Sequence, residues 1–125
     1  GVTGVQTCAL PISVVYLGTA DAAPLGAIAA ALPLAMIAEC EGTLTNLRGR
    51  VQRFLQAKAA PGHAKPAWFA AADLLIAMGE SAQYLTAGDC FAAMVVATPA
   101  FAGLQFDSLA LRGAVAPGAM AGAGR

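Results

Sequence analysis

The chain has 125 residues, with 7 basic and 7 acidic side chains and a formal net charge of zero. This balance argues against a protein whose whole surface binds nucleic acid, because such a surface would need a basic excess. Hydrophobic residues make up 58% and charged residues 11%. This composition excludes a disordered chain and is typical of a core segment cut from a larger domain.

The first twelve residues resemble the in-frame translation of a sequencing-library adaptor, and we expect them, with Cys8, to be an artefact outside the fold. They also lack the basic start of a signal peptide, since the first basic residue is Arg48. Cys8, Cys40 and Cys90 are far apart and form no Cys-x-x-Cys motif. No zinc site, iron–sulfur site or disulfide framework is therefore predicted.

The run Val14–Gly18 is β-branched and aromatic, and it predicts a buried, parallel strand. Thr19–Gly26 would then form the loop at the carboxyl end of that strand, where ligands bind in doubly wound sheets. The uncharged stretch Ala22–Ala38 is either a short transmembrane helix or a broken core segment. Its internal Pro and Gly residues favour the core segment, with a strand near Ile28–Leu32 and a bend at Pro33.

The charged residues gather after this stretch, in a predicted hairpin. Two arms, Thr43–Leu47 and Arg50–Leu55, flank a reversal at Arg48-Gly49. Arginines on such a hairpin can clamp a phosphate or a carboxylate, or they can form a solvated edge with salt bridges. Five of the seven basic residues lie here without an intervening acid: Arg48, Arg50, Arg53, Lys58 and Lys65.

No catalytic constellation is visible. Glu39 and Glu41 would share one face of a strand, but no acid–base partner can be identified for them. His63 lies beside Pro61-Gly62 in the loop Ala57–Lys65, where we expect a solvated side chain. We therefore predict neither a catalytic nor a metal-binding residue.

Two helices are predicted in the second half. Pro66–Met78 ends at Gly79, and its Trp68 and Met78 are candidates for the core of a helix buried on most sides. The second helix covers Ala87–Ala97, with Thr86 as its N-cap and Asp89 in the position of a capping box.

The C-terminal part has weaker signals. A short turn is predicted around Asp107–Leu111, ending at Gly113. From position 114 to Arg125 the chain is almost entirely Gly, Ala and Pro, and we expect a flexible tail. The predicted layout is therefore residues 1–12 as artefact, 13–113 as an incomplete α/β domain and 114–125 as tail.

The hairpin carries a family resemblance. Leu32-Pro33, followed by a pattern from Glu39 to Gln52, resembles the signature of the molybdopterin oxidoreductase superfamily. Ala60–Trp68 and Pro99–Leu104 are similar to motifs of one peripheral-arm subunit family of NADH-quinone oxidoreductase (respiratory complex I), in the C-terminal part of its molybdopterin-oxidoreductase-like domain. The residues that match the signature are Glu39, Gly42, Thr43, Asn46, Gly49, Arg50, Val51 and Gln52.

This resemblance implies the function. The chain would be a structural part of a peripheral-arm subunit on the cytoplasmic side of the bacterial inner membrane, supporting electron transfer from NADH to quinone. It would contact other parts of the same subunit and other complex I subunits, without nucleic acid and without a membrane span. It would hold no cofactor of its own, since the iron–sulfur clusters of that family belong to an N-terminal part.

Two alternatives remain open from the sequence. One is a part of a true molybdopterin-dependent oxidoreductase similar to formate dehydrogenase, with Arg48, Arg50 and Arg53 near the cofactor phosphate. In that case molybdopterin would be the cofactor. The other is a small, Ala-rich membrane protein built on Ala22–Ala38.

Overall fold

The computed structural model describes residues 13–120, so the predicted artefact at residues 1–12, Cys8 included, lies outside the described residues, as do residues 121–125. The fold is mixed α/β, as the sequence predicts, with short strands, a hairpin and two main helices. The strands and helices in order are β1 (Val15–Gly18), β2 (Ala30–Pro33), β3 (Gly42–Thr45), β4 (Arg50–Phe54), α1 (Ala67–Ala77), α2 (Ala87–Ala97), β5 (Ala114–Val115) and α3 (Pro117–Met120).

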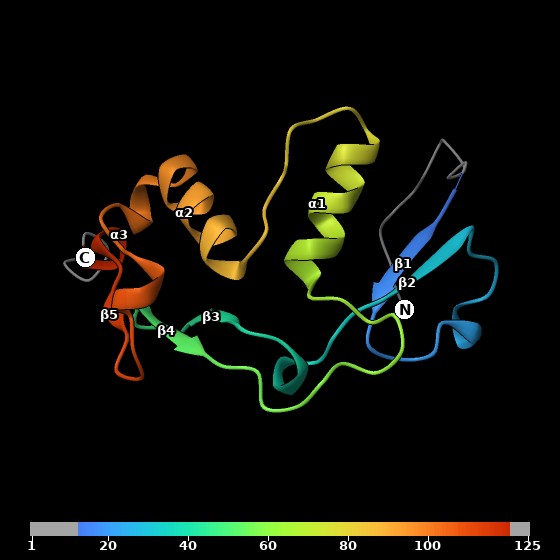
Figure 1. Cartoon of the computed structure of the whole chain (residues 1–125), viewed down its shortest axis with the longest axis horizontal. Coiled ribbons are helices and arrows are strands. Elements are labelled where there is room, and N and C mark those ends of the chain that lie inside the picture. The colour runs from blue at the N-terminus through green and yellow to red at the C-terminus, as the bar shows by residue number, and fades with distance from the viewer. Residues whose placement is uncertain (1–12, 121–125) are drawn as a thin grey trace.

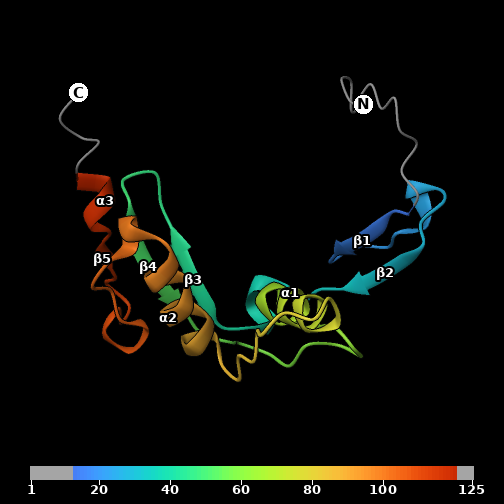
Figure 2. The same cartoon turned by 90° about the horizontal axis from the view of Figure 1, so that it is seen from above.

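The first sheet consists of β1 and β2, which pair in parallel from Val15 opposite Ala30 to Gly18 opposite Pro33. The predicted strand and its parallel pairing are thus confirmed. This sheet lies at the opposite end of the molecule from β3, β4 and β5, with α1 between the two groups (Figures 1 and 2). The predicted burial of this strand is wrong, since Val15 is 46% and Leu17 is 40% exposed.

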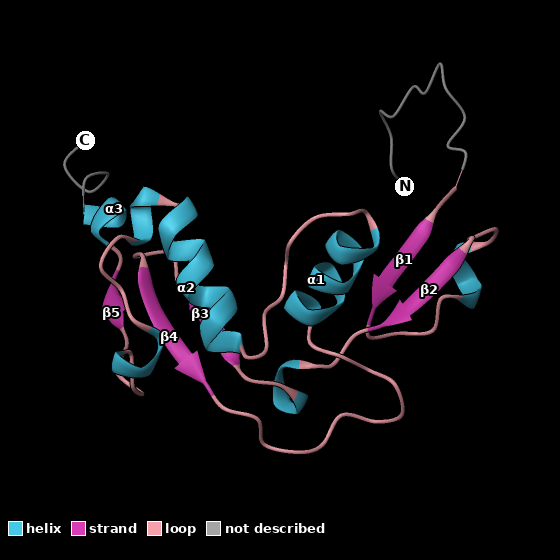
Figure 3. Cartoon of the chain, turned by 45° about the horizontal axis from the view of Figure 1, so that its top comes forward, coloured by secondary structure: helices cyan, strands magenta, loops and turns pink. Residues whose placement is uncertain are grey.

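The second sheet is antiparallel, in the order β3-β4-β5, and α2 lies against it (Figure 3). The predicted hairpin is confirmed: β3 and β4 pair from Gly42 opposite Phe54 to Thr45 opposite Val51. The main core of the molecule lies here, around the fully buried Val51 and Leu109. The other buried members of this core are Ala87, Phe91, Phe106 and Ala116.

The helix α2 begins and ends where the sequence predicts. The Thr86 hydroxyl accepts a hydrogen bond from the Asp89 N–H at 3.1 Å, and an Asp89 carboxylate oxygen accepts one from the Thr86 N–H at 2.9 Å. This reciprocal capping box satisfies N–H groups that the first helical turn leaves free. The hydrogen bonds with Thr86, and after them the one from the N–H of Leu85, hold the pKa of the Asp89 carboxyl below its ordinary value.

The helix α1 also forms where it is predicted, but its expected burial is wrong. Only Ala70 and Ala72 are buried along it, while Ile76 is 47% exposed and Met78 beyond its end is 78% exposed. Trp68, in contrast, does pack against the core. Within residues 13–120 no other helix or strand packs extensively against α1, so much of its apolar surface stays uncovered.

The apolar stretch Ala22–Ala38 does not form an α-helix. It contains two three-residue 3-10 turns, η1 (Ala23–Leu25) and η2 (Ile37–Glu39), with β2 between them. None of the helices within residues 13–120 is long and apolar enough to cross a membrane. The interruptions at Pro24, Gly26 and Pro33 explain this broken course.

The segment after Gly113 differs from the predicted flexible tail as far as it is described. Ala114 and Val115 form β5 against β4, and Ala116 is buried at 3% exposure. The N–H of Ala116 donates to the carbonyl oxygen of Gly49 at 2.8 Å. Small side chains that carry no local strand signal are thus held in place by backbone groups of the hairpin.

Candidate functional site

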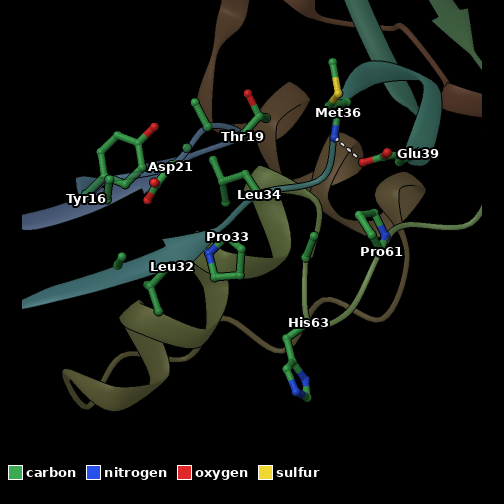
Figure 4. Close-up of a pocket in the computed structure, with 15 residues that line it drawn as sticks. Tyr16, Thr19, Asp21, Leu32, Pro33, Leu34, Met36, Glu39, Pro61 and His63 are labelled. Carbon is green, nitrogen blue, oxygen red and sulfur yellow. Dashed lines mark hydrogen bonds between the residues drawn. The ribbon is translucent and has the colours of Figure 1, made fainter. Parts of the chain in front are cut away.

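A cavity of about 370 Å³ opens at the carboxyl ends of β1 and β2 (Figure 4). Its walls come from β1 and the loop after it, from β2 and the segment after it, and from Pro61, His63 and Ala64. The sequence points to this place, because ligands bind where parallel strands end. The cavity position therefore agrees with the predicted loop Thr19–Gly26.

The third wall is positioned by a backbone bridge. The N–H of Ala35 donates to the carbonyl oxygen of Lys65 at 2.8 Å, and the N–H of Lys65 donates to that of Pro33 at 3.2 Å. Leu34 and Lys65 thereby form an isolated parallel bridge next to the end of β2. This bridge brings Pro61 and His63 into the lining of the cavity, with the His63 ring directed away from the other labelled side chains (Figure 4). His63 is exposed, as predicted.

The polar groups of the cavity are acids, hydroxyls and one imidazole. Asp21 is exposed and accepts a hydrogen bond from the N–H of Ala23 at 3.0 Å. No Lys or Arg lines the cavity, and none of the three α-helices described within residues 13–120 begins there. A phosphate group would therefore find no cationic partner among these lining residues. The side chains that supply the polar groups are Tyr16, Thr19, Asp21, Glu39 and His63.

Glu39 is the buried acid of this site, with 4% of its surface exposed. One carboxylate oxygen accepts the N–H of Met36 at 2.9 Å, and the other lies 2.9 Å from the ammonium group of Lys58. The Met36 N–H, and then Lys58, hold the pKa of Glu39 below its ordinary value against the opposing effect of burial. Glu39 therefore acts as a structural anchor for the turn η2.

Glu39 and Glu41 do not form a carboxylate pair. Glu41 binds Arg53 instead, with its carboxylate oxygen 3.2 Å from a terminal nitrogen of the guanidinium group. Each acid thus has a basic partner of its own, and the two belong to different salt bridges. This separation follows from the burial of Glu39 beneath the turn, while Glu41 stands beside β4.

Two of the three arginines that were predicted to bind an anion, Arg50 and Arg53, contact other residues of this chain. Arg50 donates to the carbonyl oxygens of Arg112 and Gly113 at 3.1 and 3.4 Å. Arg53 bridges Glu41 and Asp107, at 3.2 and 3.0 Å. Arg48 is exposed in the hairpin turn. The hairpin lies at the far end of the molecule from β1 and β2 (Figure 1), so these residues are not part of the cavity.

The two lysines of the predicted basic stretch, Lys58 and Lys65, also have acidic partners. Lys58 pairs with Glu39, and the ammonium group of Lys65 lies 3.3 Å from Asp73. Lys65 also lies 4.3 Å from the centroid of the Phe69 ring. Of the two interpretations of the basic stretch, salt bridges therefore describe Arg53, Lys58 and Lys65.

Several residues of the family signature shape the hairpin turn. The side-chain oxygen of Asn46 accepts the N–H groups of Arg48 and Arg50 at 2.9 and 3.0 Å. Gly49 has a φ of 73°, in the left-handed region that favours glycine. The N–H of Asn46 donates to the carbonyl oxygen of Arg50 at 3.0 Å, so three residues, 47–49, lie beyond this hydrogen bond of the hairpin. A loop of this length that ends in a left-handed glycine is a common hairpin connection. Asn46 and Gly49 thus determine the register of β3 and β4.

The remaining signature residues connect the hairpin to its surroundings. Val51 is fully buried in the core, and Gln52 lies beside Leu111, with an amide-to-carbonyl distance of 3.5 Å. Gly42 faces the ring of Phe54, which an added Cβ would meet at 3.0 Å. Thr43 is half-buried opposite Arg53. The signature therefore describes a packed structural unit in this chain.

Within residues 13–120 no group of three or more His, Cys, Asp and Glu side chains is placed to hold a metal ion. The sequence predicts the position of the cavity at the loop Thr19–Gly26, which contains Asp21, but it does not single out Tyr16 as a lining residue. The position of Tyr16 near the end of a predicted parallel strand is the signal that could have found it. Nothing in the sequence brings Glu39 and His63 to the same cavity.

No protein-family model matches the chain. The chain is 39% identical over 84 residues to the F420-dependent formate dehydrogenase 2 subunit alpha of Methanococcus maripaludis, which covers 66% of this chain and 12% of that protein. It is 35% identical over 78 residues to the putative formate dehydrogenase YrhE of Bacillus subtilis, which covers 62% of this chain and 8% of that protein.

The chain therefore spans only about a tenth of the length of these curated relatives. Nearly two thirds of this chain aligns with each of them, so the similarity is not limited to one short motif. The chain is therefore similar to part of a formate dehydrogenase subunit and to part of a putative formate dehydrogenase, and formate dehydrogenases are oxidoreductases.

Proposed function

We propose that this chain is part of a formate dehydrogenase-like oxidoreductase of the molybdopterin family. The observation that carries the proposal is the 39% identity over 84 residues to a formate dehydrogenase subunit. It is supported by the cavity at the carboxyl ends of β1 and β2, the edge at which α/β sheets bind ligands. In this role, β3, β4 and α2 provide a packed support, and the first sheet provides the ligand-facing edge.

The described residues do not by themselves fit a molybdopterin dinucleotide. Its phosphate groups need basic side chains or helix N-termini, and the lining of the cavity includes neither. Arg50 and Arg53 have partners within the chain and lie away from the cavity. We therefore assign no chemical step to the cofactor in this chain, and other parts of a full-length protein would have to bind its phosphates.

The experiment is to express the complete open reading frame that contains this sequence. The purified protein should contain molybdenum or tungsten and should reduce an artificial electron acceptor with formate as donor. A protein without either metal and without formate oxidation would contradict the proposal. Replacing the hairpin residue Asn46 should lower the yield of folded protein without changing the metal content per folded molecule.

A second candidate is a structural role in a peripheral-arm subunit of NADH-quinone oxidoreductase that contains a molybdopterin-oxidoreductase-like domain. It is favoured by the similarity of Ala60–Trp68 and Pro99–Leu104 to motifs of that family. In that role the chain would contact the rest of its subunit and its neighbours in the peripheral arm. Copurification with an NADH-oxidising complex, without molybdenum or tungsten, would support this candidate over the first.

A further inference from the structure

The two outer edges of the first sheet differ in their capacity to form hydrogen bonds. The outer edge of β2 carries Pro33, which has no N–H to donate. The carbonyl oxygen of Pro33 already accepts the N–H of Lys65 at 3.2 Å, and that of Lys65 accepts the N–H of Ala35 at 2.8 Å. This edge is therefore closed at its carboxyl end.

The outer edge of β1 has no such closure. The carbonyl oxygen of Gly18 accepts the N–H of Leu34 at 2.9 Å, so the backbone groups of Gly18 face β2. Backbone groups alternate in direction along a parallel strand, and those of Val15 and Leu17 therefore face outward. Besides β2, no helix or strand within residues 13–120 pairs with β1 or packs extensively against it.

The sequence of β1 is also unsuited to an exposed edge. Proteins protect exposed strand edges with charged side chains, prolines or bulges. β1 reads Val-Tyr-Leu-Gly and contains no charged residue and no proline, whereas β2 ends in Pro33. Its Val15 and Leu17 side chains are apolar and exposed. These features are typical of an interior strand, which has a neighbour on each side.

The relatives indicate where that neighbour comes from. The aligned regions make up only 12% and 8% of two much longer proteins. A second copy of this chain fits the edge less well, because two four-residue strands would bury far less than the about 1,200 Å² of a stable interface. We propose that, in the full-length protein, an extended segment from outside residues 1–125 pairs with the outer edge of β1. This pairing is expected in either of the two candidate functions, since both place the chain in a longer protein.

The test is hydrogen exchange of the full-length protein, resolved to single amides by fragmentation in the mass spectrometer. A strand on the outer edge should slow exchange at Val15 and Leu17 by at least about a hundredfold relative to unpaired amides. Fast exchange of these two beside slow exchange of Tyr16 and Gly18 would overturn the proposal, as would fast exchange of all four. This readout is independent of metal content and formate oxidation, so the pairing and the proposed function can fail separately.

Exchange of the 125-residue chain at two protein concentrations tests the second copy as the neighbour. We expect the Val15 and Leu17 amides to exchange fast at both concentrations. Protection of these amides that increases with concentration would assign the edge to a second copy and overturn the proposal.

Proline substitutions in the full-length protein compare the two edges. Leu17→Pro removes an outward N–H of β1, and Ala31→Pro is the matched control, because Ala31 lies two residues before Pro33 on the outer edge of β2. Leu17→Pro should lower the midpoint of thermal unfolding more than Ala31→Pro does, and more than Leu17→Ala, which removes only the side chain. Equal shifts for the two proline variants would contradict an interior position of β1.

Discussion

The guanidinium carbon of Arg53 lies 4.2 Å from the centroid of the Phe106 ring. The same guanidinium group binds Glu41 at 3.2 Å and Asp107 at 3.0 Å, so one side chain joins β4, the residue before β3 and the turn η4 (Phe106–Ser108). Asp107 is 94% exposed, and its ion pair contributes little on its own. The stacking on Phe106 and the packing of the half-buried Arg53 side chain contribute more to stability than this ion pair does.

Replacing Arg53 by Ala should therefore lower the free energy of unfolding by about 1–3 kcal/mol, from lost cation–π stacking and side-chain packing. Urea denaturation followed by circular dichroism would measure the change. Arg48→Ala is the matched control and should stay within about 0.5 kcal/mol, because this arginine is exposed in the turn. Equal effects of the two substitutions would contradict this role of Arg53.

Gly113→Ala should be one of the most destabilising single substitutions in the chain. Gly113 has a φ of 64°, and an added Cβ would overlap the carbonyl oxygen of Val51. The backbone conformation alone costs about 1–2 kcal/mol for a residue with a side chain, and the overlap with β4 adds to it. Gly62→Ala separates the two effects, since its φ is 53° but nothing lies within 4 Å of the added carbon. A thermal melt should show a clearly larger loss for Gly113.

Asn46→Ala should weaken the hairpin. The substitution leaves the N–H groups of Arg48 and Arg50 without their side-chain acceptor, at a cost of about 1–2 kcal/mol. Asn46→Asp keeps an acceptor oxygen and should retain most of the stability. The fully exposed Leu47, at 108%, provides a neutral control as Leu47→Ala. Hydrogen exchange of the β3 and β4 amides would locate the effect in the hairpin.

The lowered pKa of Glu39, caused first by the N–H of Met36 and then by Lys58, predicts a dependence of stability on pH. The pKa of Glu39 is lowered in the folded state, so its contribution is fully present above the unfolded-state value near 4.5. The contribution is lost as the pH falls through the lower folded-state pKa. The stability difference between the parent chain and Glu39→Gln should therefore be larger at pH 7 than at pH 3. Glu80→Gln, at an exposed position, is the control and should show little difference at either pH.

The two ends of the molecule should differ in local stability. The buried core is formed by residues 51–116, whereas β1 and β2 form a two-stranded sheet with partly exposed apolar side chains. Local opening is easier where few apolar contacts are buried. In hydrogen exchange of the chain, amides of β1 and β2 should exchange faster than those of β4 and α2. Uniform protection would show that the first sheet is more stable than its burial indicates.

Local features of the fold were predictable from the sequence, because short-range interactions determine them. The capping box of Thr86 and Asp89 forms between residues three apart, and the hairpin turn needs only Asn46 and Gly49. The parallel pairing of β1 was predicted from its apolar run and is confirmed. For the cavity, the sequence predicted its position at the carboxyl end of that strand but not the set of residues that line it.

Long-range contacts were not predictable. Ala114–Ala116 carry no strand signal, and their place in the sheet depends on β4, Arg50 and the carbonyl oxygen of Gly49. The assignment of Glu39 to Lys58 and of Glu41 to Arg53 likewise depends on which surfaces meet after folding.

The amino-acid sequence by itself determined the hairpin, the two main helices and the family signature. Only the tertiary structure decided that the signature is a packed unit, that Arg50 and Arg53 bind their own chain, and that Met78 is exposed. The physical reason is that capping and turn energies are local, whereas burial and ion pairing depend on which segments come together in space.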